Sequence, residues 1–274
     1  MNVEKGAVRS APVEARLDAG RHWRAKLGFV VLAMEQTVED DVQSMTPPGV
    51  GVHFSRIPMS NHATVETLGA MAPDITASAG LLLPDDRLDA ICYTCNSGTM
   101  VIGEEGVNAA LAKAKPEAAP TTVMTGVVRG LHALGARRIV VATPYLDEVN
   151  DYVLAFLAGH GFEVLDIQGL NLRKNTEIDL VEPEFMREYA RGLDRPDADA
   201  VFICCGALRT LDIVGALESD VGKPAVVSNQ AMMWDCLRLA GIEDVIPGYG
   251  SLLELDCAAH RSAIARESRA PRAA

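Results

Sequence analysis

One stretch of this sequence occurs twice in outline, and this duplication restricts the possible fold more than any other feature. The stretch "DAICYTCN" covers residues 89–96 and "DADAVFICCG" covers residues 197–206, so that Asp89 corresponds to Asp199 and Cys95 to Cys205. A similar correspondence joins "PTTVMTGVVRGLHALGA" to "PAVVSNQAMMWDCLRLAGI" further along the chain. An internal repeat of this length predicts two structurally similar units.

Short apolar runs rich in β-branched residues alternate with amphipathic stretches of helical length. We expect strands at residues 26–33, 51–58, 88–95, 121–124, 137–143, 162–168, 199–205 and 224–228. Strands that are apolar throughout and separated by helices are typical of parallel sheets covered on both faces. The predicted fold is α/β, with two pseudo-symmetric parallel-sheet units. Its active site is expected in the cleft between them, where the carboxyl ends of both sheets meet.

The repeat also predicts how the chain divides. We assign residues 26–120 and 224–256 to the first unit and residues 121–223 to the second, which places the two similar strands at the crossovers. Residues 1–25 and 257–274 are charged or Arg/Ala-rich and show no clear period, so we expect flexible or surface-lying tails.

Composition excludes several classes of function. The chain has 274 residues, 49% of them hydrophobic, and a formal net charge of -12, which would repel the phosphate backbone of a nucleic acid. No apolar run approaches the ~20 residues needed to cross a bilayer, and the amino-terminal stretch lacks the apolar middle of a secretion signal. We therefore expect a cytoplasmic protein that binds neither nucleic acid nor membrane.

Two of the six cysteines come at repeat-equivalent positions after apolar strands. We expect Cys95 and Cys205 each to precede a helix, with Ser97 and Thr99 as N-caps of the first. A helix N-terminus favours a thiolate and so makes the sulfur a better nucleophile or base. The alternative is that such cysteines are small buried hydrophobes, which is our interpretation of Cys92, Cys204 and Cys236.

The sequence does not predict a metal site. "CYTC" is a C-x-x-C pattern, but no second C-x-x-C or H-x-x-H pair supplies the remaining zinc ligands. The six histidines have no ligand spacing, and a nucleophilic Cys-His pair has no support from the sequence. Tyr145 ends a predicted strand, where a phenol can reach a cleft, although a core tyrosine is the ordinary alternative.

Several motifs together resemble a known family. "CYTCNSGT", "ICCGALRTLD", "GLHALGARRIVVATPYLDEVN", "SNQAMMWDCLRLAGI" and "PGYGSLL" resemble the aspartate/glutamate racemase superfamily, in its maleate cis-trans isomerase and arylmalonate decarboxylase branch. The resemblance covers about residues 26–256. Within the branch, "LAMEQTVEDD" and "NQAMMWDCLRLAGI" are most similar to the ectoine-utilisation protein A group.

The resemblance implies particular roles for residues of this chain. It implies that Cys95 and Cys205 are the two catalytic cysteines of a cofactor-independent enzyme; arylmalonate decarboxylases have glycine at the first position, so this chain is more similar to an isomerase or racemase. It further implies that a substrate carboxylate is bound by the backbone and side chains of Asn96, Ser97, Gly206 and Ala207, with Tyr145. Asn175 matches an asparagine that holds the second carboxylate in maleate isomerases.

One position departs from the family pattern. Maleate isomerases have a carboxylate-binding asparagine after the first strand, and Glu35 aligns there in this chain. A glutamate would repel a dicarboxylate but could pair with an ammonium or amide group, as in the acetylated diaminobutyrate formed when ectoine is opened. The alternative is that Glu35 faces solvent.

These features lead to one main hypothesis and two alternatives. The main hypothesis is an isomerase or racemase of a small carboxylate, which we expect to be a homo-oligomer. One cysteine would take a proton from the substrate carbon, or add to it, and the other would deliver a proton. The alternatives are an arylmalonate-type decarboxylase and a non-catalytic protein that binds a small carboxylate.

Overall fold

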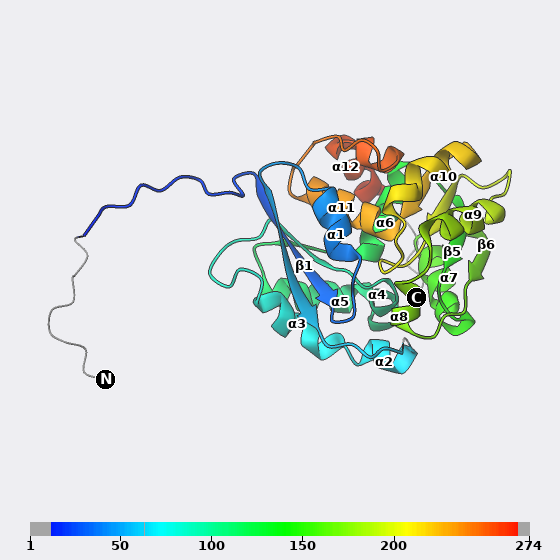
Figure 1. The fold of residues 1–274 in the computed structure, drawn as a ribbon, viewed down its shortest axis with the longest axis horizontal. Coiled ribbons are helices and arrows are strands. Elements are labelled where there is room, and N and C mark those ends of the chain that lie inside the picture. The colour runs from blue at the N-terminus through cyan, green and yellow to red at the C-terminus, as the bar shows by residue number, and fades with distance from the viewer. Residues whose placement is uncertain (1–11, 63, 268–274) are drawn as a thin grey trace.

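Two four-stranded parallel sheets form the centre of the molecule (Figure 1). The computed structural model describes residues 12–62 and 64–267. The strand orders are β2-β1-β3-β4 and β6-β5-β7-β8. The strands are β1 (Ala25–Leu32), β2 (Val50–Ile57), β3 (Ala90–Tyr93), β4 (Ala119–Thr122), β5 (Arg138–Thr143), β6 (Glu163–Gly169), β7 (Ala200–Ile203) and β8 (Ala225–Val227). All eight predicted strands and the two-sheet α/β architecture are confirmed.

Helices cover both sheets. Those of the first half are α1 (Val38–Ser44), α2 (Val65–Gly69), α3 (Ala72–Gly80), α4 (Asn96–Ile102), α5 (Glu104–Ala114) and α6 (Val123–Ala133). Those of the second half are α7 (Asp147–Gly159), α8 (Asn175–Ile178), α9 (Pro183–Leu193), α10 (Val214–Val221), α11 (Ser228–Leu239) and α12 (Cys257–Glu267), with short 3-10 helices at Leu211–Ile213 and Ser251–Glu254. The helices α3 and α5 pack together on the first sheet, and α9 and α10 pack together on the second.

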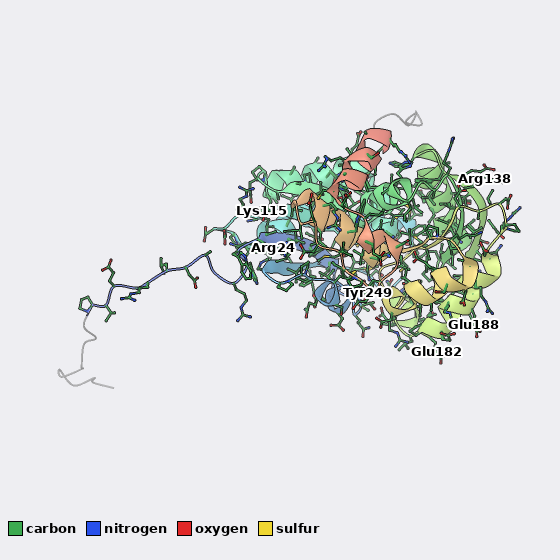
Figure 2. All side chains as sticks on the ribbon, turned by 90° about the horizontal axis from the view of Figure 1, so that it is seen from above. Arg24, Lys115, Arg138, Glu182, Glu188 and Tyr249 are labelled. Carbon is green, nitrogen blue, oxygen red and sulfur yellow. The ribbon has the colours of Figure 1, made fainter. Side chains whose placement is uncertain are left out.

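The outer helices follow the expected amphipathic period, as α9 illustrates. Met186 and Ala190 are four residues apart and both are buried against the sheet. Glu188 lies between them in sequence and is exposed at the edge of the molecule (Figure 2). Because residues four apart lie on one face of a helix, this spacing buries the apolar side chains and leaves the charged ones in water.

The duplication extends to single hydrogen bonds. Asp89 precedes β3, and its Oδ2 accepts a hydrogen bond of 2.9 Å from the backbone N–H of Lys26 at the start of β1. Asp199 precedes β7, and its Oδ2 accepts bonds of 2.9 and 2.7 Å from the N–H groups of Arg137 and Arg138 at the start of β5. Equivalent carboxylates therefore tie equivalent strands together in the two units.

Helices α6 and α11 pack against each other between the two sheets. A Cβ atom on Gly126 would lie 2.8 Å from the backbone oxygen of Ala231, so only glycine allows this close approach. Helix α11 follows the last strand of the second sheet, yet it packs on β3 and β4 of the first. The two units therefore share one continuous core.

Two strands differ from the predicted division of the chain. Strand β4 pairs with β3 in the first sheet, and β8 pairs with β7 in the second. Residues 121–122 thus lie in the first sheet and residues 225–227 in the second, opposite to our assignment. The reason is that each repeat keeps its own fourth strand, and the helix that follows that strand reaches the other unit.

The described parts of the predicted tails behave differently from each other. Residues 12–21 are exposed and extend away from the body of the molecule (Figure 1). Residues 257–267 instead form α12, which packs on α6 and buries Cys257, His260 and Ala263, so the expectation of a tail is wrong there. Residues 1–11 and 268–274, also assigned to the tails, lie outside the described residues. Within the described part of the chain, none of the helices has the length and apolar character of a membrane span.

Candidate active site

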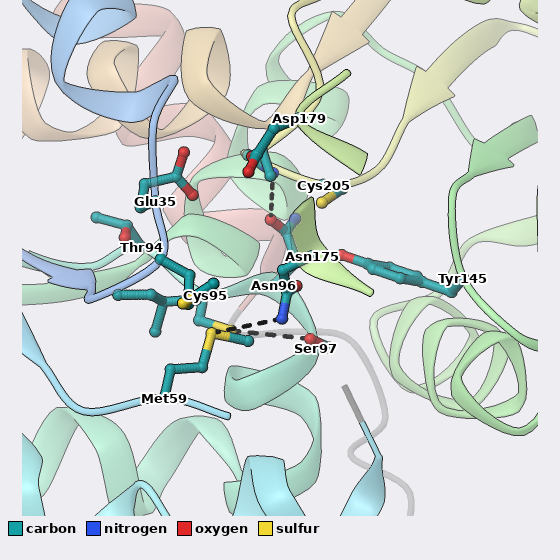
Figure 3. Close-up of a pocket in the computed structure, with 14 residues that line it drawn as sticks. Glu35, Met59, Thr94, Cys95, Asn96, Ser97, Tyr145, Asn175, Asp179 and Cys205 are labelled. Carbon is teal, nitrogen blue, oxygen red and sulfur yellow. Dashed lines mark hydrogen bonds between the residues drawn. The ribbon is translucent and has the colours of Figure 1, made fainter. Parts of the chain in front are cut away.

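All nine predicted site residues line one pocket at the carboxyl ends of the two sheets (Figure 3). The pocket contains about 450 Å³ of space between atoms, part of it open to solvent. The predicted residues are Glu35, Cys95, Asn96, Ser97, Tyr145, Asn175, Cys205, Gly206 and Ala207. The remaining lining residues, which the sequence analysis missed, are Leu32, Met34, Met59, Thr94 and Asp179.

Cys95 lies between β3 and α4 and is itself the N-cap of that helix. Its Sγ accepts a hydrogen bond of 3.2 Å from the N–H of Gly98 and lies 3.7 Å from the hydroxyl of Ser97. The prediction of a cysteine at a helix N-terminus is therefore confirmed, whereas the expected caps Ser97 and Thr99 are inside the helix. Burial raises the pKa of Cys95, and these hydrogen bonds offset the effect only in part.

Gly98 permits this cap because it has no side chain. A Cβ atom there would lie 2.6 Å from the hydroxyl of Tyr93 and 3.0 Å from the sulfur of Cys95. We expect Gly98→Ala to lower kcat/KM about ten- to a hundredfold, because the sulfur must move away from its catalytic position. Steady-state kinetics would measure the loss. Gly106→Ala is the matched control, since its Cβ would approach nothing closer than 3.8 Å; equal activity of both variants would contradict the prediction.

The backbone conformation of Cys205 differs from that of Cys95. Its φ is 123°, which is rare for a residue with a side chain and indicates local strain. The predicted helix does not follow directly: a turn and a 3-10 helix come first, and α10 begins only at Val214. The N–H of Cys205 donates to the hydroxyl of Ser228 at 3.0 Å. Burial raises the pKa of Cys205 to about 12, although Tyr145 and the N–H of Ala207 act in the opposite direction.

Asn96 joins the two half-sites. Its Nδ2 donates to the hydroxyl of Ser228 at 2.9 Å, and its Oδ1 accepts from the N–H of Gly206 at 3.2 Å. Asn96 is 2% exposed and both polar ends of its side chain have partners within the protein, so it positions the Cys205 loop. A role of this side chain in binding a carboxylate stays a prediction.

Groups that can bind an anion remain at the pocket. The N–H groups of Asn96 and Ser97 occupy the first two positions of α4, where no intrahelical acceptor exists. Tyr145 is 5% exposed, and burial together with the nearby Cys205 raises its pKa well above the usual value, so its hydroxyl stays protonated. These donors surround the two sulfur atoms and would stabilise negative charge on a bound carboxylate or enolate.

Asn175 lines the pocket, but its side-chain N–H groups bond to the backbone outside it. Its Nδ2 donates to the backbone oxygens of Ser60 and Asn61 at 3.2 and 3.3 Å, which links α8 to the loop after β2. Its Oδ1 has no hydrogen-bond partner among the described residues. The predicted contact with a second carboxylate needs the amide N–H groups, and in this structure the protein already uses them.

Glu35 is buried, 8% exposed, and does not face solvent. Its Oε1 accepts hydrogen bonds from the N–H groups of Gln36, Thr37 and Val38 at 3.0, 2.8 and 3.2 Å, at the start of α1. Its Oε2 has no partner among the described residues. Burial raises the pKa of Glu35, and the charge of Asp179 adds to the effect.

Asp179 is the polar lining residue that the sequence analysis missed. It is 7% exposed; its Oδ2 accepts a bond of 2.7 Å from the side chain of Gln36, and its Oδ1 is buried without a partner. A sequence signal existed, because Asp179 follows Asn175 by four residues and the two therefore share one face of a helical turn. The loop aligned poorly with the family, and this spacing was not used.

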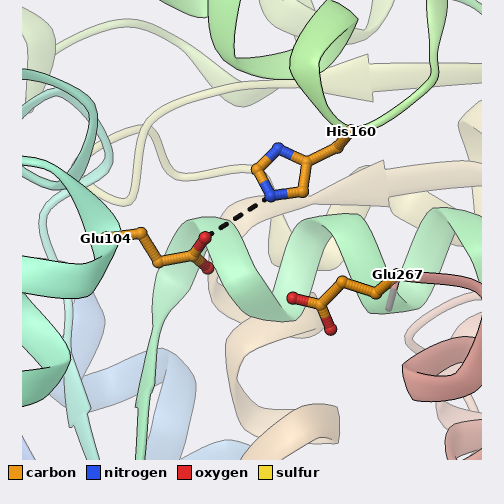
Figure 4. Close-up of side chains that lie close together, drawn as sticks. All are labelled: Glu104, His160 and Glu267. Atoms are coloured by element: carbon orange, nitrogen blue, oxygen red, sulfur yellow. Dashed lines mark ion pairs between the residues drawn. The ribbon is translucent and has the colours of Figure 1, made fainter. Parts of the chain in front are cut away.

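The structure also brings together three potential metal ligands far from one another in sequence. Ligand atoms of Glu104, His160 and Glu267 lie within 4.8 Å of one another (Figure 4). Each already has a partner, however: His160 Nε2 lies 3.4 Å from Glu104, and Glu267 accepts a bond of 3.0 Å from Arg129. The group is best described as an ion-pair network that joins α5, α7, α6 and α12.

We expect the His160–Glu104 pair of this network to stabilise the fold fully between about pH 4.5 and 6.5. Burial lowers the pKa of His160, but Glu104 reverses the effect and leaves it raised; burial raises the pKa of Glu104, but His160 and Thr125 leave it lowered. The stabilisation is therefore lost as pH rises through the folded pKa of His160, or falls through that of Glu104. His160→Gln should cost about 0.5–1 kcal/mol of unfolding free energy at pH 6 and less at pH 8.

Urea titrations at the two pH values would measure this difference. His132 provides a control of opposite sign, because burial lowers its pKa. Any stabilisation by His132 is present above about pH 6.5 and is lost as pH falls. A cost of His160→Gln that increased toward pH 8 would contradict the assignment.

The chain is similar in sequence to known proteins. The profile of the arylmalonate decarboxylase family matches residues 104–253. The maleate isomerase of Nocardia farcinica is 30% identical over 244 residues, which cover 85% of this chain and 97% of that protein. The arylmalonate decarboxylase of Bordetella bronchiseptica is 38% identical over 156 residues, 54% of this chain and 64% of that one.

Solved structures agree as well. The maleate cis-trans isomerase of Nocardia farcinica, with a cysteine replaced by serine and a covalently bound succinylcysteine intermediate, superposes with a TM-score of 0.78 at 26% identity, over 85% of this chain and 99% of that one. Fold and site thus define a two-unit α/β enzyme with a pocket cysteine from each unit. The chain belongs to the arylmalonate decarboxylase family, and it is an isomerase-type member related to maleate isomerases along most of its length.

Proposed function

We propose that the chain is a cofactor-independent isomerase or racemase that acts on a small carboxylate. The observation that carries this proposal is the pair of cysteines, Cys95 and Cys205, which reach one pocket from repeat-equivalent positions of the two units. A reaction whose product is a stereoisomer of its substrate needs two similar reactive groups on different sides of one carbon, and a duplicated half-site supplies them.

The chemistry can follow one of two balanced routes. In racemisation, one thiolate removes the proton from the substrate carbon, and the other thiol protonates the resulting carbanion from the far side, leaving a new thiolate. In cis-trans isomerisation, a thiolate adds to one carbon of the double bond, and the electron pair moves to the neighbouring carbon as an enolate, which the other thiol can protonate. The former double bond then rotates as a single bond, and removal of that proton expels the thiolate. The succinylcysteine of the Nocardia enzyme supports the second route in that relative.

The substrate must help to activate the thiols. Burial raises the pKa of both cysteines in the empty pocket, and the charge of Glu35 raises them further. The protonated thiol, which is a proton donor, therefore predominates before binding. Formation of the thiolate then depends on the anion-binding N–H groups and on charges that the substrate brings.

A panel of substrates tests the proposal. The purified protein would be incubated with maleate, with each enantiomer of aspartate and glutamate, and with the two acetylated diaminobutyrates that form when ectoine is opened. Chiral chromatography would detect each stereoisomeric product. The resemblance to the ectoine-utilisation group favours the acetylated diaminobutyrates within this panel. If no compound is isomerised or racemised, and radiolabelled ligands still bind, the site would be that of a carboxylate-binding protein.

The decarboxylase relative supports a second candidate. Removal of carbon dioxide from a disubstituted malonate leaves an enolate that one cysteine could protonate. This reaction would need Cys205 alone, so activity toward arylmalonates in Cys95→Ala, measured as carbon dioxide release, would favour it over isomerisation.

A further inference from the structure

One side of the pocket presents acceptors and negative charge. Gln36 joins two carboxylates there: its backbone N–H donates to Glu35 Oε1 at 3.0 Å and its side chain donates to Asp179 Oδ2 at 2.7 Å. Figure 3 shows Glu35 and Asp179 among the labelled side chains that line the pocket, together with the two cysteines. Each carboxylate thus has one oxygen bound within the protein and one oxygen that has no partner in residues 12–62 and 64–267.

The free oxygens require a ligand of particular chemistry. Asp179 Oδ1 is buried with no hydrogen-bond donor in reach, an arrangement that is unfavourable unless something else supplies the donor. Asn175 adds a third acceptor, because its Nδ2 is used by the loop after β2. None of the described residues that line the pocket is a lysine, arginine or histidine; the nearby Arg56 donates to the backbone oxygen of Glu35 at 2.9 Å and pairs with Glu39.

The opposite chemistry surrounds the sulfur atoms. There the pocket presents the N–H groups at the start of α4 and the hydroxyls of Ser97 and Tyr145. A ligand that satisfies both sides carries a carboxylate at one end and a protonated amine at the other. A dicarboxylate would place its second negative charge against two carboxylates, which disfavours binding.

We propose that Glu35 and Asp179 form a subsite for the protonated amine of an amino-carboxylate substrate. This inference rests on the proposed function, since it assigns the substrate class of the same pocket. Binding of the amine also has a chemical consequence. The negative charge of Glu35 raises the pKa of Cys95 and Cys205, and the positive charge of the amine would offset this effect. Substrate binding would thereby promote formation of the thiolate.

Calorimetric titration with two ligands of matched length tests the subsite. 4-Aminobutyrate and glutarate share one carboxylate and the same number of methylene groups, and they differ at the other end, which is an ammonium in the first and a carboxylate in the second. We expect the wild-type protein to bind 4-aminobutyrate more tightly. Asp179→Asn should weaken the binding of 4-aminobutyrate about ten- to a hundredfold and leave that of glutarate unchanged or stronger.

Two further variants keep the test decisive. Glu35→Gln retains an acceptor for the start of α1 and should shift the preference in the same direction. Glu177→Gln removes a negative charge from the exposed side of α8, two residues from Asp179, and should leave the preference unchanged. Thermal unfolding would verify that each variant is folded. If Asp179→Asn is unfolded, Glu35→Gln decides alone.

The outcomes separate this inference from the proposed function. Tighter binding of glutarate by the wild-type protein, or equal effects of Asp179→Asn on both ligands, would overturn the amine subsite even if the enzyme isomerises maleate. Selective binding of 4-aminobutyrate, together with no isomerisation or racemisation of any compound in the substrate panel, would support the subsite and overturn the proposed function.

Discussion

Replacing either pocket cysteine with alanine is expected to lower kcat/KM for isomerisation by about 10²- to 10⁴-fold. Each cysteine serves one side of the reacting carbon, so that loss of Cys95 or of Cys205 removes one of two obligatory groups. The double variant should be little worse than either single variant, because residues that act as a unit do not contribute additively. Chiral chromatography of the product would measure the rates.

The two single variants should nevertheless differ from an inactive protein. With a substrate that has an exchangeable C–H bond, each is expected to incorporate deuterium from heavy water on the side that its remaining cysteine serves, without net inversion. Mass spectrometry would detect the exchange. Cys257→Ala is the thiol control, because Cys257 lies in α12 away from the pocket. Full turnover by Cys95→Ala would rule out the paired-thiol mechanism.

Loss of Asp235 is expected to destabilise the fold by about 3–5 kcal/mol. This carboxylate is fully buried and accepts hydrogen bonds from Thr121, His260 and Arg129 at 2.6, 2.6 and 3.1 Å. Asp235→Ala would leave the guanidinium of Arg129, whose side chain is only 14% exposed, with less compensating negative charge. The free energy of unfolding, measured by urea titration with all thiols reduced, would report the change.

Controls distinguish this network from a simple loss of charge. Asp151→Ala removes an exposed carboxylate from α7 and should stay within about 0.5 kcal/mol of the wild type. Asp235→Asn keeps the shape of the side chain and should cost less than alanine. Were Asp235→Ala as stable as Asp151→Ala, the buried network would not hold α12 to the core.

The strands and the cysteine pair could be predicted because each depends on local pattern. Apolar runs such as those of β1 and β5 are buried on both faces, and their composition alone distinguishes them from helices. The repeat supplied evidence that a single motif does not. Cys95 alone could equally be a buried core residue, but two cysteines at equivalent positions of a repeat are not readily explained by coincidence.

The orientation of polar side chains could not be predicted in the same way. Asn96 and Asn175 both reach the pocket region, yet their amides are bonded to Ser228 and to the loop after β2, contacts that depend on how the two units face each other. The surroundings of Cys205 were also missed, since helix-favouring residues follow it but its positive φ and the intervening turn arise from tertiary packing.

Two opposing effects set the pKa of the thiols, and the sequence alone does not show which effect is larger. A helix N-terminus lowers a thiol pKa, and Cys95 has that position. Burial acts in the opposite direction and is the larger effect for both cysteines. Which effect dominates depends on how completely the pocket excludes water, and that is a property of the assembled units.

The packing of α6 against α11 has a consequence for the origin of the chain. Each helix follows the last strand of one repeat and is buried where the two repeats meet. A polypeptide that contained a single repeat would expose this helix, together with the glycine face that Gly126 provides for its partner. Such an ancestor could bury the helix only by associating with a second copy of itself. Gene duplication would then have converted a symmetric dimer into one chain, after which its two half-sites were free to diverge, as the different backbones of Cys95 and Cys205 now show.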